Sequence, residues 1–476
     1  EPFGATPHSG SAGVIPAQEV VETGLGAASK AGADGCIVLV HEGSHADVRF
    51  ALNTTTTNGV QRSRDVSVVV IAGDGVATAS RAGVVGADGV TEMVTDALAD
   101  ARQSPPAEDA FALVDASDGA PGRRSFDQGP EETDASALDD VLSSLSGAFG
   151  RARARDVVLA GFAEIDVGTL YLGSSTGVRL SHMQPTAAVN LVGRTADGSD
   201  SAWVGVPSID PSLEAMEDEI WRRLDWGRKQ IALDAGRYEV ILPPSGVADM
   251  MATIDYDALG GQDTEDGRTV FSKEGGGTRI GETITSLPFT LYSDPEEAGV
   301  ECRPFVAAGA SSSEVSVFDN GLPCPRTDWL RDGVLARLRY HRAGAARSGA
   351  TMAPYIDNLI LRCGVHDGGS VDDMVARTES GLLLTCLWYI RTVDPATLLM
   401  TGLTRDGVYV IENGKVVGAA NNFRFNESPV DLLVRATEVG TPVRALGREF
   451  GEHLNRTIMP ALRIPDYNMS TVSQAS

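Results

Sequence analysis

Residues 236–259 read GRYEVILPPSGVADMMATIDYDAL, and this stretch places a strand shortly before a helix. The β-branched and apolar residues of Arg237–Leu242 predict the strand. Apolar residues then recur at helical spacing over Val247–Leu259, which predicts a helix with one apolar face. The stripe on that face consists of Val247, Met250, Met251, Ile254 and Ala258. We place the main domain boundary just before the strand, so that the chain divides into 16–235 and 236–476.

The part before this boundary mixes helices with strands. Apolar spacing predicts a helix over 17–31, and the β-branched segments that follow it predict strands. Residues 104–133 are rich in Pro, Gly and acidic side chains, which predicts a linker inside this domain. The Pro-, Gly- and Ser-containing start, residues 1–15, lacks a secretory signal pattern and is expected to be disordered.

The part after the boundary consists mostly of predicted strands. Asn413-Gly414 is a two-residue hairpin signal between two short β-branched runs. A helix is expected over Trp329–Tyr340, and strands over Glu314–Phe318 and Gly381–Ile390. The fold class is therefore α+β, with an N-terminal α+β domain followed by a β-rich C-terminal domain.

Composition excludes several classes of protein. The formal net charge of -26 over 476 residues repels phosphate backbones and argues against nucleic-acid binding. The sequence has no run of eighteen apolar residues, so we expect no membrane span and a cytoplasmic location. The five cysteines are widely spaced and odd in number, which argues against a disulfide framework or a zinc ribbon.

The segment His41-Glu42-Gly43-Ser44-His45 spells H-E-x-x-H. On a helix this spacing brings two imidazoles to one face, where they bind zinc while the Glu acts as general base. Here the motif lies between two predicted strands, and Gly43 and Ser44 favour a turn. We therefore interpret it as an exposed hairpin turn, with a metal site as the alternative.

No other motif supplies a catalytic set. Gly275-Gly276-Gly277 is not followed by G-K-[ST] and lacks Rossmann spacing, and no G-x-S-x-G elbow occurs in the sequence. We therefore assign no catalytic, cofactor-binding or metal-binding residue in this chain.

Three stretches together resemble the TldD/PmbA family, and specifically its PmbA (TldE) branch. The first runs from Arg49-Phe50-Ala51-Leu52-Asn53 through Thr57-Asn58-Gly59 to Arg64, with Leu52 where the family has Asn. The second is Tyr238–Pro243, which resembles the strand that opens the C-terminal domain. The third is Arg391–Pro395, followed by Gly402 and Ile411–Lys415. The resemblance covers roughly residues 15–470.

The resemblance implies the activity of this family, in which TldD and TldE form a heterodimeric zinc peptidase that acts on unfolded or modified peptides. The TldD branch carries H-E-x-x-x-H on the helix after the opening strand, and a cysteine near the C-terminus. The matching positions here are Ala252-Thr253-Ile254-Asp255-Tyr256-Asp257, and no cysteine follows Cys386. Without both imidazoles and the thiolate, Asp257 alone cannot provide a three-ligand catalytic zinc site.

The resemblance therefore implies a non-catalytic subunit that has no cofactor of its own, with zinc held by a TldD-like catalytic partner. Two alternatives stay open at this point. One is a self-sufficient hydrolase with a non-zinc site on the same scaffold. The other is a homodimeric peptide-binding scaffold without chemistry, in which exposed strand edges bind extended peptide.

Overall fold

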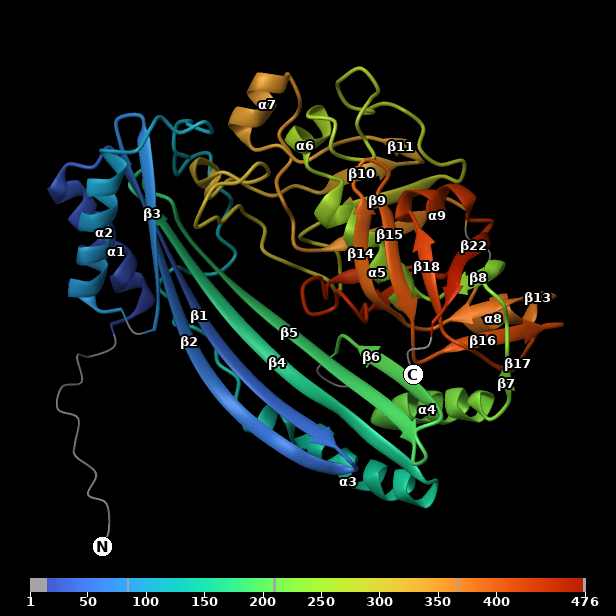
Figure 1. Cartoon of the computed structure of the whole chain (residues 1–476). Coiled ribbons are helices and arrows are strands. Elements are labelled where there is room, and N and C mark those ends of the chain that lie inside the picture. Colours follow the sequence, from blue (N-terminus) through green and yellow to red (C-terminus); the bar gives the residue numbers. More distant parts are fainter. Residues whose placement is uncertain (1–14, 84, 209–210, 366–367, 474–476) are drawn as a thin grey trace, which may run out of the picture.

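The computed structural model describes residues 15–83, 85–208, 211–365 and 368–473. A long curved sheet forms the first part of the chain, and two further sheets form the second part (Figure 1). The fold is α+β with a β-rich C-terminal part, as the sequence predicts. Of the start that we expected to be disordered, residues 1–14 lie outside the described residues.

The N-terminal sheet has six antiparallel strands in the order β3-β2-β1-β4-β5-β6. Four of these strands are 17 to 19 residues long, which makes each of them roughly 55–65 Å in length. The strands are β1 Gly35–Ala51, β2 Thr54–Ala72, β3 Gly75–Ala82, β4 Val157–Ser174, β5 Arg179–Thr195 and β6 Ser201–Val206.

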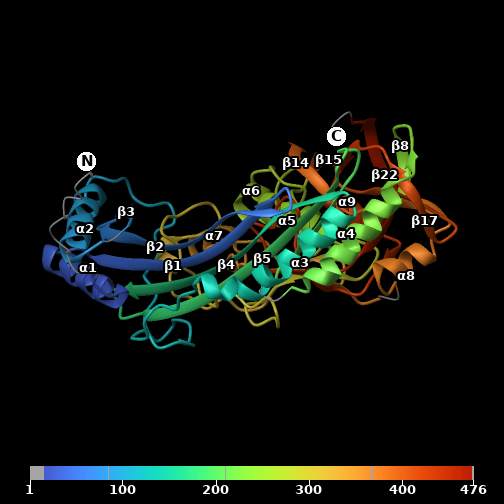
Figure 2. The ribbon, with the colours of Figure 1, turned by 90° about the horizontal axis from the view of Figure 1, so that it is seen from below.

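Helices cover one face of this sheet, and the C-terminal part covers the other (Figure 2). Even-numbered side chains of β1 pack on the helices, because neighbouring side chains of a strand point to opposite faces. Odd-numbered Ile37 and Leu39 pack instead against Phe305 and Phe318 of the C-terminal part. The helices are α1 Ala17–Ala31 and α2 Ala87–Ala101 at one end, and η1 Ala135–Leu138, α3 Asp139–Ala154 and α4 Leu213–Gly227 at the other.

The segment expected as a linker, 104–133, holds no helix or strand in the structure. It nevertheless packs on the molecule, because Val114 and Ala120 are buried between the sheet and the C-terminal part.

The C-terminal part holds a ten-stranded sheet and a six-stranded sheet. Helix α5, Pro244–Asp257, contacts β8 of the larger sheet and β20 and β21 of the smaller one, so it lies in the core between them. The larger sheet contains β7 Gln230–Ile231, β8 Gly236–Leu242, β13 Ser380–Leu384, β14 Leu387–Asp394, β15 Leu399–Thr404, β16 Val408–Glu412, β17 Lys415–Ala420, β18 Phe423–Glu427, β19 Glu438–Val439 and β22 Leu462–Val472. The smaller sheet contains β9 Phe289–Ser293, β10 Thr327–Arg331, β11 Val334–Leu335, β12 Leu359–Cys363, β20 Val443–Ala445 and β21 Thr457–Met459. The shorter helices are α6 Gly261–Glu265, η2 Val317–Asp319, α7 Arg342–Ser348, α8 Val371–Ala376 and α9 Pro429–Arg435.

Three predictions of local structure in this part were wrong. The helix expected over Trp329–Tyr340 is the β10–β11 hairpin, because Asp332 and Gly333 both adopt positive φ and turn the chain back. The strand expected over Glu314–Phe318 gives way to the 3-10 helix η2, which Ser316 caps. The single strand expected over Gly381–Ile390 is two strands, β13 and β14, with a break at Thr385-Cys386.

The hairpin at Asn413-Gly414 is confirmed. It joins β16 to β17, and both turn residues have positive φ, at 48° and 75°. This is the backbone conformation of the type I′ turn that Asn-Gly favours.

Candidate functional site

Helix α5 is the helix predicted from the opening stretch of sequence, but it begins three residues earlier and ends two residues earlier than predicted. Pro244 lies in its first turn, where its fixed φ suits a helix and its missing N–H leaves no bond unmade. Every residue from Gly246 to Asp255 is buried. The helix is thus enclosed on all sides, whereas the sequence predicted a single apolar face.

The positions that match H-E-x-x-x-H are occupied by side chains with structural contacts. Ala252 is only 1% exposed and belongs to the main C-terminal core. The Thr253 hydroxyl donates to the carbonyl of Met250 in its own helix at 2.8 Å. Asp257 accepts a hydrogen bond from Thr392 of β14, also at 2.8 Å.

These residues do not fit a catalytic zinc ion, which requires three protein ligands drawn from His, Cys, Asp and Glu. Nowhere in the described part of the chain do three or more such side chains gather in an arrangement that could hold a metal ion. Cys386, the last cysteine in the sequence, is a fully buried free thiol, and burial raises its pKa. A thiol in that state is a poor metal ligand, because the thiolate is the form that binds.

Asp249 connects α5 to a loop two hundred residues further along the chain. Its carboxylate accepts three main-chain hydrogen bonds, from Arg448 at 2.8 Å and from Glu449 and Phe450 at 3.0 Å each. Burial raises the pKa of Asp249 to about 7, and the three amides oppose that shift. The loop in turn holds β14, because Glu449 accepts from the Tyr389 amide and from Arg391.

A second buried carboxylate on α5, Asp255, pairs with Arg339. The Arg339 guanidinium donates to the Asp255 carbonyl at 2.6 Å and to its carboxylate, and also to Glu314 at 3.1 Å. It also lies 4.9 Å from the ring centroid of Tyr355. Burial raises the pKa of Asp255 to about 6 against the attraction of Arg339. A buried pair of this kind fixes the position of α5. Removal of one partner strongly destabilises the fold, because the other charge is left buried without a partner.

The H-E-x-x-H segment lies in the middle of β1, so its prediction as a hairpin turn was wrong. Gly43 and Ser44 are paired on both sides, with β2 and with β4, and long neighbouring strands override the local turn preference. His41 and His45 face the C-terminal part from positions four residues apart, which in a strand is roughly 13 Å. His45 bonds Asp166 across the ladder at 2.8 Å, and no shared metal geometry results.

A cavity of about 490 Å³ opens above these residues, between the sheet and the C-terminal part. Its floor is the cross-strand pair Gly43 and Gly168, where a methyl group on Gly168 would lie 2.8 Å from the His41 ring. Arg456 closes it from the other side, donating to Asp357 at 2.7 Å and to Thr186 of β5. The polar side chains of its walls are those of His41, His45, Gln61, Ser63, Asp166, Gln184 and Thr186.

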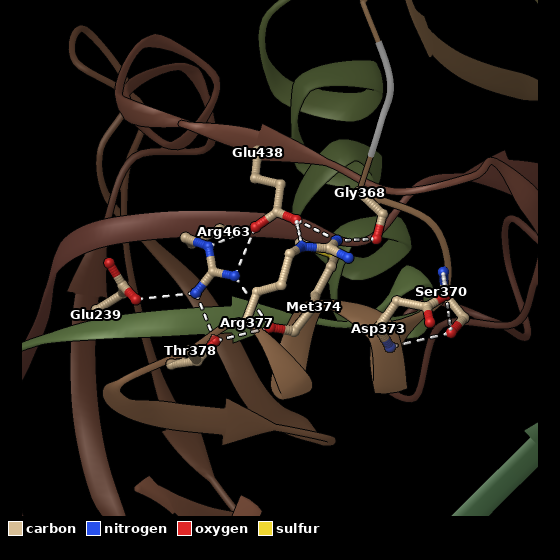
Figure 3. Close-up of polar contacts among 9 residues, drawn as sticks. All are labelled: Glu239, Gly368, Ser370, Asp373, Met374, Arg377, Thr378, Glu438 and Arg463. Carbon is tan, nitrogen blue, oxygen red and sulfur yellow. Dashed lines mark hydrogen bonds and ion pairs between the residues drawn. The ribbon is translucent and has the colours of Figure 1, made fainter. Parts of the chain in front are cut away.

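A network of charged side chains joins strands of the larger sheet to helix α8 (Figure 3). Arg463 of β22 donates to Glu438, Glu239, Thr378 and the carbonyl of Met374. Arg377 donates to the same Glu438 and to the Gly368 carbonyl. Every side-chain nitrogen of Arg463 donates a hydrogen bond within the protein. The network therefore joins β8, β19, β22 and α8 and leaves no free cationic group on Arg463. Ser370 caps α8, and Asp373 in the first turn of the helix accepts from the Ser370 amide to complete a capping box.

The family-like N-terminal segment has a structural role that the sequence did not reveal. Leu52 and Asn53 form the turn between β1 and β2 with positive φ. The Asn53 amide bonds both the Val157 carbonyl and the Leu159 amide of β4, at 2.8 Å and 2.7 Å. Arg64, at the segment's other end, pairs with Glu42. The turn is therefore fixed to the sheet, while Leu52 itself is 76% exposed.

Residues 235–471 match the model of the PmbA/TldA metallopeptidase C-terminal domain. A search of curated proteins by sequence found no match. Three crystal structures share the fold over nearly the whole chain. TldE from Thermococcus kodakarensis has a TM-score of 0.76 at 16% identity, covering 95% of this chain and 99% of that one.

The other two structures carry the description modulator of DNA gyrase. That from Bacteroides thetaiotaomicron has a TM-score of 0.76 at 16% identity, covering 96% of this chain and 99% of that one. That from Thermotoga maritima has a TM-score of 0.72 at 13% identity, covering 95% and 99%. The α+β architecture with its β-rich C-terminal part thus matches that of these structures. With the match over its C-terminal half, the chain belongs to the TldD/PmbA family.

None of the helices in the described residues has the length and hydropathy needed to cross a bilayer.

Proposed function

We propose that this chain is a non-catalytic, TldE-like subunit of a TldD/TldE-type zinc metallopeptidase that acts on unfolded or modified peptides. The observation that carries the proposal is the state of α5. The helix keeps its place between the two sheets, while its motif positions hold Ala252, Thr253 and Asp257.

The packing around α5 supports the proposal that this helix does not bind zinc. Ala252 is enclosed by core side chains, so an imidazole could not enter that position without displacing them. Thr253 has no carboxylate with which to activate a water molecule, and its hydroxyl is already bonded to the helix. Zinc chemistry must then come from a partner that carries H-E-x-x-x-H.

Metal content is the first test. We expect the purified chain to hold far less than one zinc ion per molecule after exposure to excess zinc and desalting. A related chain bearing H-E-x-x-x-H serves as the positive control. One zinc ion retained per molecule of this chain would contradict the proposal.

Activity of the reconstituted pair is the second test. Thr253→Ala and Asp257→Asn in this chain should leave peptide hydrolysis by the pair within about twofold, because neither side chain takes part in the reaction. Replacement of the motif Glu in the catalytic partner should abolish hydrolysis. Loss of activity on changing Thr253 or Asp257, with the pair still assembled, would show that this chain holds catalytic residues.

A further inference from the structure

One half of strand β2 has a neighbour on one side only. Strand β3 pairs with Asp65–Ala72 and ends there, while β1 pairs with the whole length of β2. All ten residues of Thr54–Ser63 are exposed. At about 3.3 Å per residue, this leaves roughly 33 Å of strand whose outer edge is unpaired within the described residues.

The hydrogen bonds at the paired end show which groups face outward. The Ile71 carbonyl accepts from Asp34 on the β1 side, whereas the Arg64 carbonyl accepts from Gly83 on the β3 side. The register between β1 and β2 is regular from Gly35↔Ile71 to Arg49↔Thr57. Because main-chain groups alternate along a strand, the N–H and C=O groups of the even-numbered residues Asn58, Val60 and Arg62 point away from β1.

Apart from a β-bulge at Thr56, where the register with β1 shifts, this edge lacks the charges and prolines by which proteins keep sheet edges apart. Thr54–Gln61 contains no charged residue and no proline, and four of its residues are threonine, which favours strands. Arg62, the one charged residue of Thr54–Ser63, is paired with Glu132. A long, neutral, unpaired edge presents a template for one more strand.

The character of the edge favours a peptide over a folded partner as that strand. A stable protein interface has an apolar core, but Val60 is the one large apolar side chain exposed along Thr54–Ser63, at 46%. Hydrogen bonds between the main chains of this edge and a bound peptide do not require a particular peptide sequence. On the sheet face that Gln61 and Ser63 share with Gly43, the cavity of about 490 Å³ leaves room for side chains of different sizes.

We propose that the outer edge of Thr54–Ser63 binds an extended, unfolded peptide as an additional strand, through the main-chain groups of Asn58, Val60 and Arg62. This deepens the proposed function, on which it rests, by giving this chain a substrate-holding surface. The two are separable, because peptide binding by this edge does not require a catalytic partner.

Proline substitution tests the edge directly. Val60→Pro removes an outward N–H without breaking the β1 ladder, and Thr78→Pro makes the matched change at an exposed, outward position of β3. With fluorescein-labelled oxidised insulin B chain as the unfolded probe, Val60→Pro should bind about tenfold more weakly than the unaltered chain. Thr78→Pro should bind as the unaltered chain does. Equal binding by both variants, or equal loss in both, would overturn the proposal.

Peptide chemistry provides a test that leaves the protein unaltered. A peptide N-methylated at alternate residues keeps one intact edge and should bind within about threefold of the parent peptide, whereas a fully N-methylated peptide should not bind. Hydrogen exchange in the complex should slow at Asn58, Val60 and Arg62. Binding without that slowing would place the peptide elsewhere and overturn the proposal, as would slowing of these amides in a homodimer that forms without peptide.

Failure of the peptide-binding proposal can be distinguished from failure of the proposed function. Should the chain retain zinc or assemble with no H-E-x-x-x-H partner, yet bind peptide with this pattern, the edge assignment stands and the subunit role falls. Should it assemble with such a partner and show no peptide protection on β2, the subunit role stands and the edge assignment falls.

Discussion

At the scale of single residues, Asp249 connects α5 to a distant part of the chain. One buried carboxylate satisfies three amides of a loop that holds β14. The sequence placed Asp249 on the helix, but nothing in it indicated the bonding partners, which are about two hundred residues away. Asp255 and Arg339 were unpredictable for the same reason. The position of α5 after the opening strand, by contrast, could be predicted from the local sequence.

We expect Asp249→Ala to lower the free energy of unfolding by about 3 kcal/mol or more, because it leaves three amides without acceptors. Asp257→Ala, which loses one exposed hydrogen bond to Thr392, should cost less than about 1 kcal/mol. Urea unfolding followed by circular dichroism measures both. Equal effects of the two changes would mean that Asp249 does not hold the loop.

His341 predicts a dependence of stability on pH. Its Nδ1 accepts from the Gly344 amide and so caps α7, which requires that nitrogen to be unprotonated. Burial lowers the pKa of His341 below its ordinary value of 6.5, while Asp319 and Asp109 oppose the shift. The unfolded chain then binds a proton more readily than the folded one, so stability present above about pH 6.5 is lost as pH falls.

Thermal unfolding at about pH 7.5 and about pH 5.5 measures this contribution. His341→Asn keeps a neutral capping acceptor, and its melting temperature should fall less than that of the unaltered chain over this range. The difference between the two proteins isolates His341 from the carboxyl groups that titrate over the same range. An identical fall in both would contradict the assignment.

At the scale of elements, local signals succeeded where the turn itself decides the structure. Asn413-Gly414 was predictable because few other residue pairs reach two positive φ angles. The turn predicted at Gly43-Ser44 was wrong because the pairing of β1 with two long neighbouring strands outweighs the turn preference of two residues. The length of those neighbouring strands cannot be inferred from the segment itself. The Trp329–Tyr340 hairpin was missed because apolar spacing outweighed the Asp332-Gly333 turn signal within it.

Gly414→Ala should destabilise the protein by about 1–3 kcal/mol, because it combines a φ of 75° with a Cβ only 2.5 Å from the Ala376 carbonyl. Gly349→Ala is the matched change at a φ of 64° with open space around it, and should cost about 1 kcal/mol. Chemical denaturation ranks the two variants. Gly349→Ala as the more damaging change would contradict the steric account of the hairpin.

The packing of α5 predicts the effect of introducing the H-E-x-x-x-H residues into this helix. The triple change Ala252→His, Thr253→Glu and Asp257→His should not give a chain that retains stoichiometric zinc, because His at 252 must enter a filled core. We expect destabilisation of about 1–3 kcal/mol, caused mainly by Ala252→His. Asp257→His alone, at an exposed position, should be nearly neutral. Elemental analysis together with thermal unfolding measures both properties, and a stable triple variant with one tight zinc ion would contradict this account of α5.

At the scale of the whole molecule, the curved sheet and the C-terminal part are held together by contacts spread over the chain. Phe305 and Phe318 pack on odd-numbered residues of β1, and Arg456 reaches Thr186. The fold class was predictable from the alternation of patterns and from family resemblance. The cavity between the two parts was not, because its walls come from β1, β2, β4, β5 and Arg456, and only tertiary folding brings these together.

Native mass spectrometry of the protein isolated from its own cells tests the central claim most directly. The proposed function predicts a heterodimer with a chain that carries H-E-x-x-x-H, and one zinc ion that stays with that partner when the complex is dissociated in the gas phase. A homodimer or a monomer of this chain that retains one zinc ion per molecule would contradict it.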